Sequence, residues 1–331
     1  MGDLILVTGG AGYVGSHLTR KLLARGYRVR VLDSLMYGHH GLEDFGPRPD
    51  LEFMPGDVGA ERDLVRAVKG ARTVVALAAI VGDAACDVDP SRTMAINYES
   101  TRHLLAASRD AGVERLVFAS SCSVYGANGN DLLHEHSHLN PVSLYARTRI
   151  MSEESLLNQR DIEVIILRLA TVCGVSPRMR FDLMVNTMTA CATAQGTIRV
   201  TGAKQWRPHL HVRDAAEAFR LAVEAPLPAE RVFNVGSDGQ NFTVGEIAER
   251  VAQRIAGTHI DYAPNGHDLR SYRVCFDRIH SVFGFQPELT VDDAISEVEE
   301  LMSSGAVADF RNEQFHNAKW LSTNGRMQGA A

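Results

Sequence analysis

Residues 4–15 read Leu4-Ile5-Leu6-Val7-Thr8-Gly9-Gly10-Ala11-Gly12-Tyr13-Val14-Gly15, and the stretch Ser16 to Arg25 that follows has helical spacing. A buried strand that turns through glycines into a helix is built to hold a pyrophosphate. The glycines let the backbone approach the phosphates, and the helix N-terminus offers free N–H groups. We therefore predict a dinucleotide site formed by Gly9, Gly12, Tyr13, Val14 and Gly15.

A carboxylate completes this motif. Asp33 ends the next apolar run, Val29-Arg30-Val31-Leu32, eighteen residues past Gly15. A carboxylate at this position accepts hydrogen bonds from the adenosine ribose hydroxyls and repels a 2′-phosphate. No Arg or Lys follows in residues 34–36. NAD is therefore the predicted cofactor, in preference to NADP.

Further apolar strand-like runs alternate with helix-like stretches through the first half of the chain. The runs are 51–54, 73–77, 116–119 and 164–167, and a long helix is expected from about Ser91 to Ala111. Alternation with short connections is typical of parallel strands joined by right-handed crossovers. The predicted fold class is α/β: a Rossmann-type doubly wound parallel sheet with a smaller mixed α/β substrate-binding part.

The regular alternation ends after about Val172, which suggests where the chain divides. We predict an NAD-binding domain over 1–175 and an interlocked substrate-binding part over 176–321, of which about 205–240 returns to the Rossmann sheet. The last residues, 322–331, read as a flexible tail. Because no linker or repeat separates the two parts, they are expected to interlock.

Composition narrows the classes of partner. The chain has 331 residues, 45% of them hydrophobic. Its formal net charge of −6 gives no reason to expect nucleic acid as a partner. No apolar run approaches the roughly 20 residues that span a bilayer, and the early first strand leaves no room for a signal peptide. Five scattered cysteines without paired spacing fit free thiols in the cytoplasm.

Two segments in the middle of the chain carry candidate catalytic groups. Ser121 and Ser123 follow the strand-like run ending at Ala119, where ligands bind outside the carboxyl ends of parallel strands. Tyr145 and Arg149 lie four residues apart on one face of an expected helix. The cation is predicted to favour the phenolate and to lower the pKa of Tyr145 from about 10, making it a general base.

In the order and content of these motifs the chain resembles the extended short-chain dehydrogenase/reductase superfamily, specifically its NAD-dependent nucleotide-sugar epimerase/dehydratase branch. The resemblance covers nearly the whole chain, to about Trp320. It implies that Ser121 hydrogen-bonds the sugar hydroxyl being oxidised and that Tyr145 removes that hydroxyl proton. It also implies a nucleotide-diphosphate sugar as substrate.

The same resemblance assigns further binding residues. Toward NAD it implies Asp57 and Val58 beside the adenine, Ala78 and Ala79 along the dinucleotide, and Asn97 as a helix residue that supports the site. Toward the substrate it implies Arg207 and Arg270 on the diphosphate, a role that Arg273 could share. Two guanidiniums suit one pyrophosphate, because each donates paired hydrogen bonds to phosphate oxygens.

Two departures from the family pattern bear on the reaction. The family's Tyr-x-x-x-Lys is Tyr-x-x-x-Arg here, and the broader guanidinium of Arg149 cannot take the same position as a Lys ammonium. Catalysis is then weakened, retuned or lost, and the residues alone leave these outcomes open. Family dehydratases place an Asp-Glu pair directly after the position of Ser121, whereas this chain has Cys122 and Ser123, which disfavours dehydration.

Other polar clusters are weaker candidates. Arg178 and Arg180 precede an expected helix over 181–194. The two arginines could meet a phosphate or sugar, or they could form a solvated helix start. Arg180, and Asn186 one turn further on, are the candidate substrate ligands. The sequence His134-Glu135-His136-Ser137-His138 is rich in metal-ligand types but lies in an expected solvated loop, so no metal site is predicted.

These observations favour a nucleotide-sugar epimerase acting at C4, an isomerase that oxidises its substrate transiently to a ketosugar and returns the hydride to the other face. A nucleotide-sugar dehydrogenase, ketoreductase, decarboxylase or 4,6-dehydratase on the same scaffold is the nearest alternative. A non-catalytic NAD-binding protein is the alternative from another class. Apolar residues Ile150, Met151, Leu156 and Leu157 permit a homodimer through the Tyr145 helix, and core packing explains them equally well.

Overall fold

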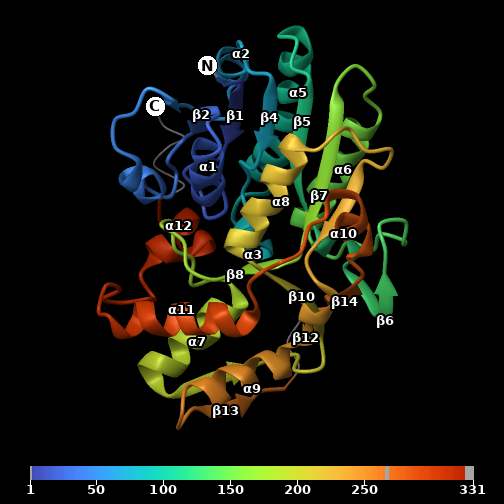
Figure 1. Ribbon diagram of the computed structural model, residues 1–331. Coiled ribbons are helices and arrows are strands. Elements are labelled where there is room, and N and C mark those ends of the chain that lie inside the picture. Colours follow the sequence, from blue (N-terminus) through green and yellow to red (C-terminus); the bar gives the residue numbers. More distant parts are fainter. Residues whose placement is uncertain (1, 265–267, 325–331) are drawn as a thin grey trace.

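The computed structural model describes residues 2–264 and 268–324, and a parallel sheet runs through its centre (Figure 1). Its seven strands lie in the order β11-β7-β5-β4-β1-β2-β3. They are β1 Leu4–Thr8, β2 Arg28–Asp33, β3 Leu51–Pro55, β4 Thr73–Ala76, β5 Arg115–Ser121, β7 Glu163–Leu169 and β11 Val232–Val235. Every neighbouring pair is parallel. The order reverses direction between β1 and β4, the place where doubly wound sheets bind ligands.

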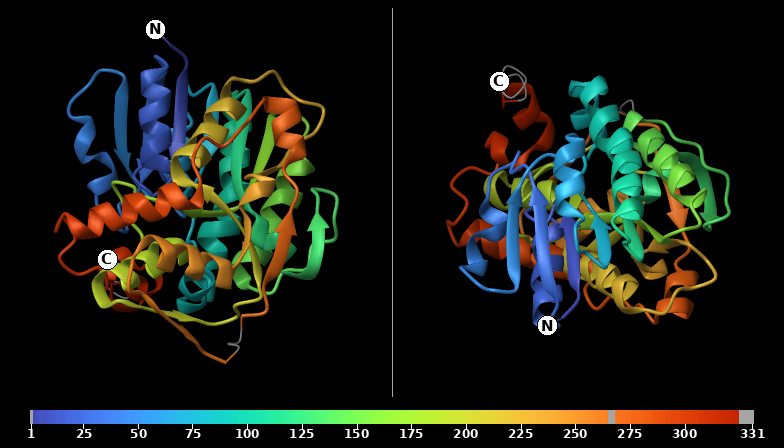
Figure 2. Two further views of the ribbon diagram at one scale, coloured as in Figure 1. Left: turned by 60° about the horizontal axis from the view of Figure 1, so that its bottom comes forward. Right: turned by 90° about the horizontal axis from the view of Figure 1, so that it is seen from above.

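Helices cover both faces of this sheet, as the view from above shows (Figure 2). Helices α1 (Gly15–Ala24) and α8 (Val212–Glu224) pack on one face; α2 (Glu61–Ala67), α5 (Ser100–Asp110) and α6 (Leu144–Leu157) pack on the other. Strand β5 shows why both faces need cover: Val117 points into the first core, while Leu116 and Phe118 point into the second. The predicted doubly wound fold is confirmed.

The second half of the chain adds smaller sheets beside the carboxyl ends of the central strands. Strand β10 (Trp206–His211) lies between β8 (Thr171–Cys173) and β12 (Asn241–Thr243), β13 (His259–Tyr262) pairs with β9 (Thr197–Val200), and β14 (Ser271–Val274) pairs with β6 (Ala127–Leu133). The helices are α7 Met184–Gln195, α9 Val244–Arg254, α10 Asp277–Phe283, α11 Val291–Ser303 and α12 Asn317–Asn324. In Figure 1, α7, α9 and α11 lie together below the sheet.

Three predicted elements differ from those observed. The helix expected over 181–194 begins at Met184, because residues 181–183 form a bend in which the Phe181 N–H donates to the Phe315 carbonyl at 3.0 Å. The helix expected from Ser91 is α4 (Pro90–Met94) followed by a π-helical turn over Ala95–Glu99 and then α5. The predicted tail is partly helical, since α12 runs to Asn324, while residues 325–331 lie outside the described residues.

A buried ion pair joins helix α6 to the strands that flank it. Arg168 on β7 donates to Glu153 on α6 at 2.6 Å, and both side chains are almost fully buried. Glu153 also accepts the hydroxyl hydrogen of Ser120 on β5, and Arg168 donates to the Tyr125 hydroxyl at 3.1 Å. This network fixes α6, which carries Tyr145, against the end of β5, which carries Ser121.

Removing one partner of this pair should destabilise the protein strongly. We expect Glu153→Ala to lower the free energy of unfolding by about 3–5 kcal/mol, because Arg168 is left as an uncompensated buried charge. Urea unfolding followed by circular dichroism measures the loss. The adjacent Glu154 is exposed, and Glu154→Ala should change the stability by less than about 0.5 kcal/mol. Equal losses from both variants would contradict this role of Glu153.

Candidate functional site

A cavity of about 580 Å³ opens at the carboxyl ends of the central strands, between the sheet and the second half of the chain. Its walls come from the glycine loop after β1, the ends of β2, β4 and β5, the start of α6, and the segment before α7. Groups far apart in the sequence therefore meet around one space.

The glycine loop forms one end of this cavity. Gly9 has φ +75°, in the left-handed region that favours glycine, and a Cβ there would lie 2.8 Å from the Ala78 nitrogen. A Cβ on Gly15 would lie 2.1 Å from the carbonyl oxygen of Gly9, so a side chain cannot fit without moving the loop. Helix α1 begins at Gly15 and points its N-terminus at the loop. Gly9, Gly12, Tyr13, Val14 and Gly15 all line the cavity.

Asp33 lies beside this loop and fixes it. Its carboxylate accepts the Ala11 N–H at 3.0 Å and the Leu35 N–H at 2.9 Å. Burial raises the pKa of Asp33, and these two hydrogen bonds and the charge of Arg178 oppose the rise. The carboxylate that the sequence assigns to the adenosine ribose therefore lines the cavity, next to the glycine loop.

The opposite wall of this end contains the remaining predicted cofactor residues. Asp57, Val58, Ala78 and Ala79 line the cavity. Asn97 does not; it lies behind the wall, in the π-helical turn. Its amide accepts the Ile80 N–H at 2.8 Å and donates to the Ile80 carbonyl at 2.9 Å. Asn97 thus holds the loop after β4 in position, which agrees with a supporting role.

Tyr145, proposed for proton transfer, and Arg149, proposed to favour its phenolate, line the cavity from the first half of α6. Ser143 caps this helix by accepting the Ala146 N–H at 3.2 Å. The guanidinium carbon of Arg149 lies 5.5 Å from the ring centroid of Tyr145 and 5.2 Å from that of Phe118. Arg149 donates to the carbonyls of Asn97 at 3.1 Å and Ala119 at 3.2 Å, and its Nε is buried without a hydrogen-bond partner in the described structure.

The predicted effect on the phenol is wrong in its net sign. Burial raises the pKa of Tyr145 above its ordinary value, and the positive charge of Arg149 only opposes that rise. Burial also lowers the pKa of Arg149. The cation does favour the phenolate, as predicted, but desolvation of the ring and hydroxyl outweighs it in this structure.

The serines at the end of β5 also face the cavity. The Ser121 hydroxyl accepts the Ser123 N–H at 3.1 Å, and both residues line the cavity with Tyr145. The Ser123 hydroxyl is buried and has no hydrogen-bond partner among the residues described. Between them lies Cys122, which is fully buried and donates its thiol hydrogen to the Arg168 carbonyl; burial raises the pKa of this thiol. Cys122 can therefore act neither as an acid/base partner nor as a nucleophile in the cavity.

Arginines from the second half of the chain also line the cavity. Arg207 and Arg270 line it and share the carboxylate of Asp268: Arg207 donates to Oδ2 at 3.1 Å, and Arg270 donates to both oxygens, at 2.9 and 2.7 Å. Arg273 does not line it. The guanidinium carbon of Arg273 lies 4.7 Å from the Trp206 ring centroid, so its predicted role on the diphosphate finds no support here.

Two further candidates are Arg180, in the segment before α7, and Asn186, in the first turn of α7. Arg180 lines the cavity and donates both ends of its guanidinium to Asp182, at 2.9 and 3.0 Å. Asn186 lies outside the lining; it accepts the Gly174 N–H and donates to the Tyr13 hydroxyl at 3.1 Å. Tyr13 in turn donates to the Gly174 carbonyl. Asn186 therefore ties the second half of the chain to the glycine loop rather than facing a ligand.

Arg178, the other arginine of this segment, also lies at the site. It lines the cavity, its guanidinium carbon lies 4.3 Å from the Tyr37 ring centroid, and its Nη2 donates to Asn317 at 2.6 Å. Its Nε has no partner in the described part of the chain, and burial lowers the pKa of Arg178 to about 10. The arginines of this segment are buried, so the alternative of a solvated helix start is wrong.

The histidine-rich loop is more buried than expected. Glu135 is buried; its Oε1 accepts the Asn234 N–H at 2.9 Å, and its Oε2 lies 3.5 Å from Arg278. Its histidine neighbours His134, His136 and His138 are exposed. Glu135 thus holds β11 in place through this hydrogen bond. The expectation of a solvated loop is correct for the three histidines and wrong for Glu135.

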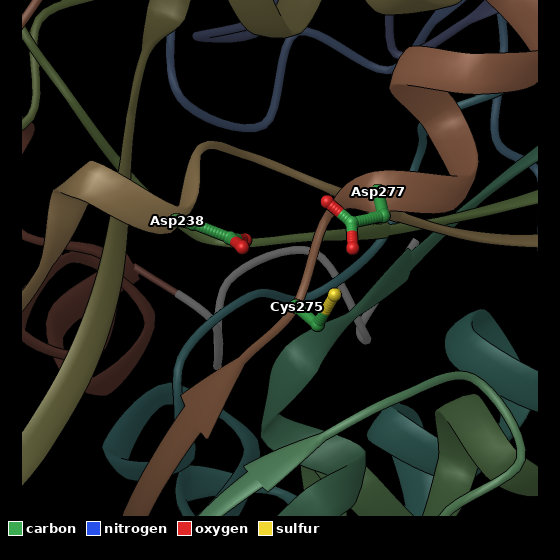
Figure 3. A group of neighbouring side chains, drawn as sticks. All are labelled: Asp238, Cys275 and Asp277. Carbon is green, nitrogen blue, oxygen red and sulfur yellow. The ribbon is translucent and has the colours of Figure 1, made fainter.

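One cluster of metal-ligand types lies elsewhere among the described residues. Asp238, Cys275 and Asp277 offer ligand atoms within 4.8 Å of one another, from the turn after β11, the end of β14 and the start of α10 (Figure 3). Asp238 already accepts the Phe276 N–H at 2.8 Å, and burial raises the pKa of the Cys275 thiol to about 11. None of the three lines the cavity, and we assign no metal to them.

Fold and cavity together define a dinucleotide-binding α/β protein in which a glycine loop, a tyrosine, a serine and a pair of arginines line one cavity. The chain belongs to the NAD dependent epimerase/dehydratase family, whose model matches residues 5–236. NAD is therefore the cofactor. Over the described ranges, no helix is long and apolar enough to cross a membrane.

Individual relatives agree with this membership. A UDP-glucose 4-epimerase from Rhizobium meliloti (strain 1021) is 30% identical over 312 residues, which cover 86% of this chain and 92% of the relative. The structure of MoeE5 in complex with UDP-glucuronic acid and NAD matches at 28% identity with a TM-score of 0.78, over 92% of this chain and 100% of that one. TunA, an NAD-dependent NDP-hexosamine 5,6-dehydratase, matches at 27% identity with a TM-score of 0.79, over 93% and 100%.

Proposed function

We propose that this protein is an NAD-dependent nucleotide-sugar epimerase that acts at C4. One observation carries the proposal: Tyr145 and Ser121 line the same cavity as the glycine loop, Arg207 and Arg270. A nucleotide sugar has its reactive alcohol and its diphosphate in one molecule, so it needs both groups in one cavity. The relatives described above, a UDP-glucose 4-epimerase and a protein in complex with UDP-glucuronic acid, support this class of substrate.

The cavity fits NAD at its glycine end. Gly15 lies so close to Gly9 that it has no room for a side chain. The backbone N–H groups of the loop and of the helix N-terminus are then free to face a pyrophosphate, which binds to such groups. Asp33 would hold the adenosine ribose, Asp57 and Val58 the adenine, and Ala78 and Ala79 the dinucleotide between them. When bound, NAD accepts and returns the hydride.

The residues of this chain supply the proton transfer and the orientation. Tyr145 would take the proton of the sugar hydroxyl as that carbon is oxidised and return it after the ketosugar has turned its other face. Ser121 would hydrogen-bond the same oxygen. Arg149 stabilises the phenolate by its charge and braces α6 against Asn97 and Ala119, so that the phenol keeps its position through both half-reactions.

Arg207 and Arg270 would bind the diphosphate, and Arg180 is the candidate contact for the sugar. The nature of these groups favours a phosphate-bearing substrate, because guanidiniums donate paired hydrogen bonds to phosphate oxygens.

A 4,6-dehydratase of this family requires an Asp-Glu pair directly after the position of Ser121, and this chain lacks that pair. The family's acid/base pair is replaced by Cys122 and Ser123, and the buried Cys122 thiol has no contact with the cavity. TunA, a dehydratase, is among the structural matches, so the scaffold itself supports either reaction. The side chains after Ser121 favour epimerisation.

A homodimer and a cytoplasmic location remain predictions. All five cysteines are free, which supports a reducing compartment. Of the apolar residues that permitted a dimer, Leu156 is fully buried, and Ile150 and Leu157 pack against the cores of their own chain. Light scattering on the purified protein distinguishes monomer from dimer directly.

Incubation with UDP-, dTDP-, GDP-, ADP- and CDP-sugars, followed by NMR of the products, tests the proposed reaction. We expect one of these sugars to give its C4 epimer, without net NADH production or consumption. Mass spectrometry of small molecules released from the protein should find NAD. A 4-keto-6-deoxy product or net NADH formation would replace the epimerase with one of its alternatives, and retained NAD without any turnover would favour a binding protein.

A further inference from the structure

We propose that Asp83 is a resident counter-ion of Arg270 that the diphosphate of the substrate displaces, so that Asp83 weakens diphosphate binding. The proposal rests on the proposed function, because it assigns a diphosphate to Arg207 and Arg270. It concerns a carboxylate that neither the sequence motifs nor the proposed mechanism uses.

Asp83 reaches Arg270 from the opposite wall of the cavity. It is the first residue of α3 (Asp83–Val88), which follows the loop after β4, and its Oδ2 lies 2.7 Å from Nη1 of Arg270. Arg270 precedes β14, in the second half of the chain. Both residues line the cavity. The ion pair therefore connects the cofactor side of the cavity to the side proposed for the diphosphate.

Carboxylates occupy both edges of the Arg270 guanidinium. Its Nε and Nη2 donate to Asp268, and its Nη1 pairs with Asp83. A phosphate binds arginine best through two parallel N–H groups on one edge. No complete edge is free in this arrangement, so a diphosphate must displace at least one of the two carboxylates.

Asp83 is the carboxylate with fewer partners. Asp268 accepts three hydrogen bonds from Arg270, one of them from its backbone N–H, and a fourth from Arg207. The Oδ1 of Asp83 is buried and has no hydrogen-bond partner within residues 2–264 and 268–324. Freeing Nη1 from Asp83 breaks one ion pair. Freeing Nε and Nη2 from Asp268 breaks two hydrogen bonds to a carboxylate that two further donors hold in place, so Asp83 is the carboxylate that the diphosphate displaces.

A negative charge at this position also acts on the ligand itself. Once displaced, the Asp83 carboxylate still lines the cavity and repels the diphosphate. Replacing it with a neutral amide removes both the competition for Arg270 and this repulsion. For charges a few ångströms apart near a protein surface, the change is expected to strengthen binding by about tenfold or more.

Calorimetric titration of the NAD-loaded protein tests this inference, with inorganic pyrophosphate and UDP as probes. We expect Asp83→Asn to bind both probes about tenfold more tightly than the unchanged protein. Asp83→Glu, which keeps the charge, should show no such gain. Asp87→Asn is the matched control, because Asp87 is an exposed carboxylate on the same short helix and lies outside the cavity; it should leave both affinities unchanged.

The outcomes separate this inference from the proposed function. Equal or weaker binding of both probes by Asp83→Asn would overturn the role of Asp83 while leaving the diphosphate site in place. An equal gain from Asp87→Asn would also overturn it, because a general change in charge would then explain the effect. If neither probe binds the unchanged protein or Asp83→Asn, the assignment of Arg207 and Arg270 to a diphosphate is wrong.

Discussion

Replacing Tyr145 with Phe should reduce the epimerase rate by about 10²–10⁴-fold, the range that one general acid–base group contributes. The change removes only the phenolic oxygen. The ring, which lies against Arg149, is kept, so the walls of the cavity stay as they are. The rate of product formation, measured by NMR with the sugar that the panel identifies, gives the loss.

NAD retention separates a chemical defect from a structural one. Tyr145→Phe should keep its NAD, since the glycine loop and Asp33 hold the other end of the cavity. Tyr262→Phe serves as the matched control: this tyrosine is 52% exposed and lies outside the cavity, and its loss of a hydroxyl should not affect the rate. Full activity in Tyr145→Phe would mean that another group moves the proton.

The second large effect is expected from Gly15→Ala. The added Cβ would lie 2.1 Å from the Gly9 carbonyl oxygen and 2.7 Å from the Gly10 Cα. Both are backbone atoms, so the loop must move away from helix α1 and its N–H groups lose their common direction. We expect the affinity for NAD to fall by about 100-fold or more, since a forced shift of packed backbone costs several kcal/mol. Titration of NAD into cofactor-free protein measures the change.

Gly239→Ala is the control for this substitution. A Cβ at Gly239 would meet its nearest heavy atom at 4.0 Å, and Gly239 lies outside the cavity. It should bind NAD as the unchanged protein does. If Gly15→Ala binds NAD equally well, the glycine loop is not the pyrophosphate site.

The cofactor end of the site could be predicted from sequence because its geometry is local. Residues 4–33 form one strand, loop, helix and strand, and the glycines and Asp33 occupy fixed places within that unit. The positions of Tyr145 and Arg149 could be predicted for the same reason, because the two residues lie four apart on one face of α6. Short-range periodicity was therefore enough to identify the doubly wound sheet and these residues.

The substrate end could not be predicted in the same way. Asp83, Asp268 and Asn317 come from three distant segments and meet only because the second half of the chain folds over the sheet. Asn186 was predicted to face a ligand because it follows Arg180 in the sequence. The start of α7 at Met184 turns Asn186 toward Gly174 and Tyr13 instead.

Burial explains the remaining errors. The sign of the Tyr145 pKa shift depends on how completely the phenol is removed from water, which sequence spacing does not report. The same applies to Arg178, whose solvation was left open from sequence and which proves to be enclosed between Tyr37 and Asn317. Motifs indicated the residue types at the site, while packing decided their electrostatics.

The proposed reaction is tested most directly by a nucleotide sugar that carries deuterium at C4. In an epimerase the hydride leaves C4 and returns to the same carbon from the other face. NMR of the product should therefore show the inverted C4 centre with its deuterium retained. Loss of the deuterium to solvent, or its accumulation in free NADH, would contradict the account.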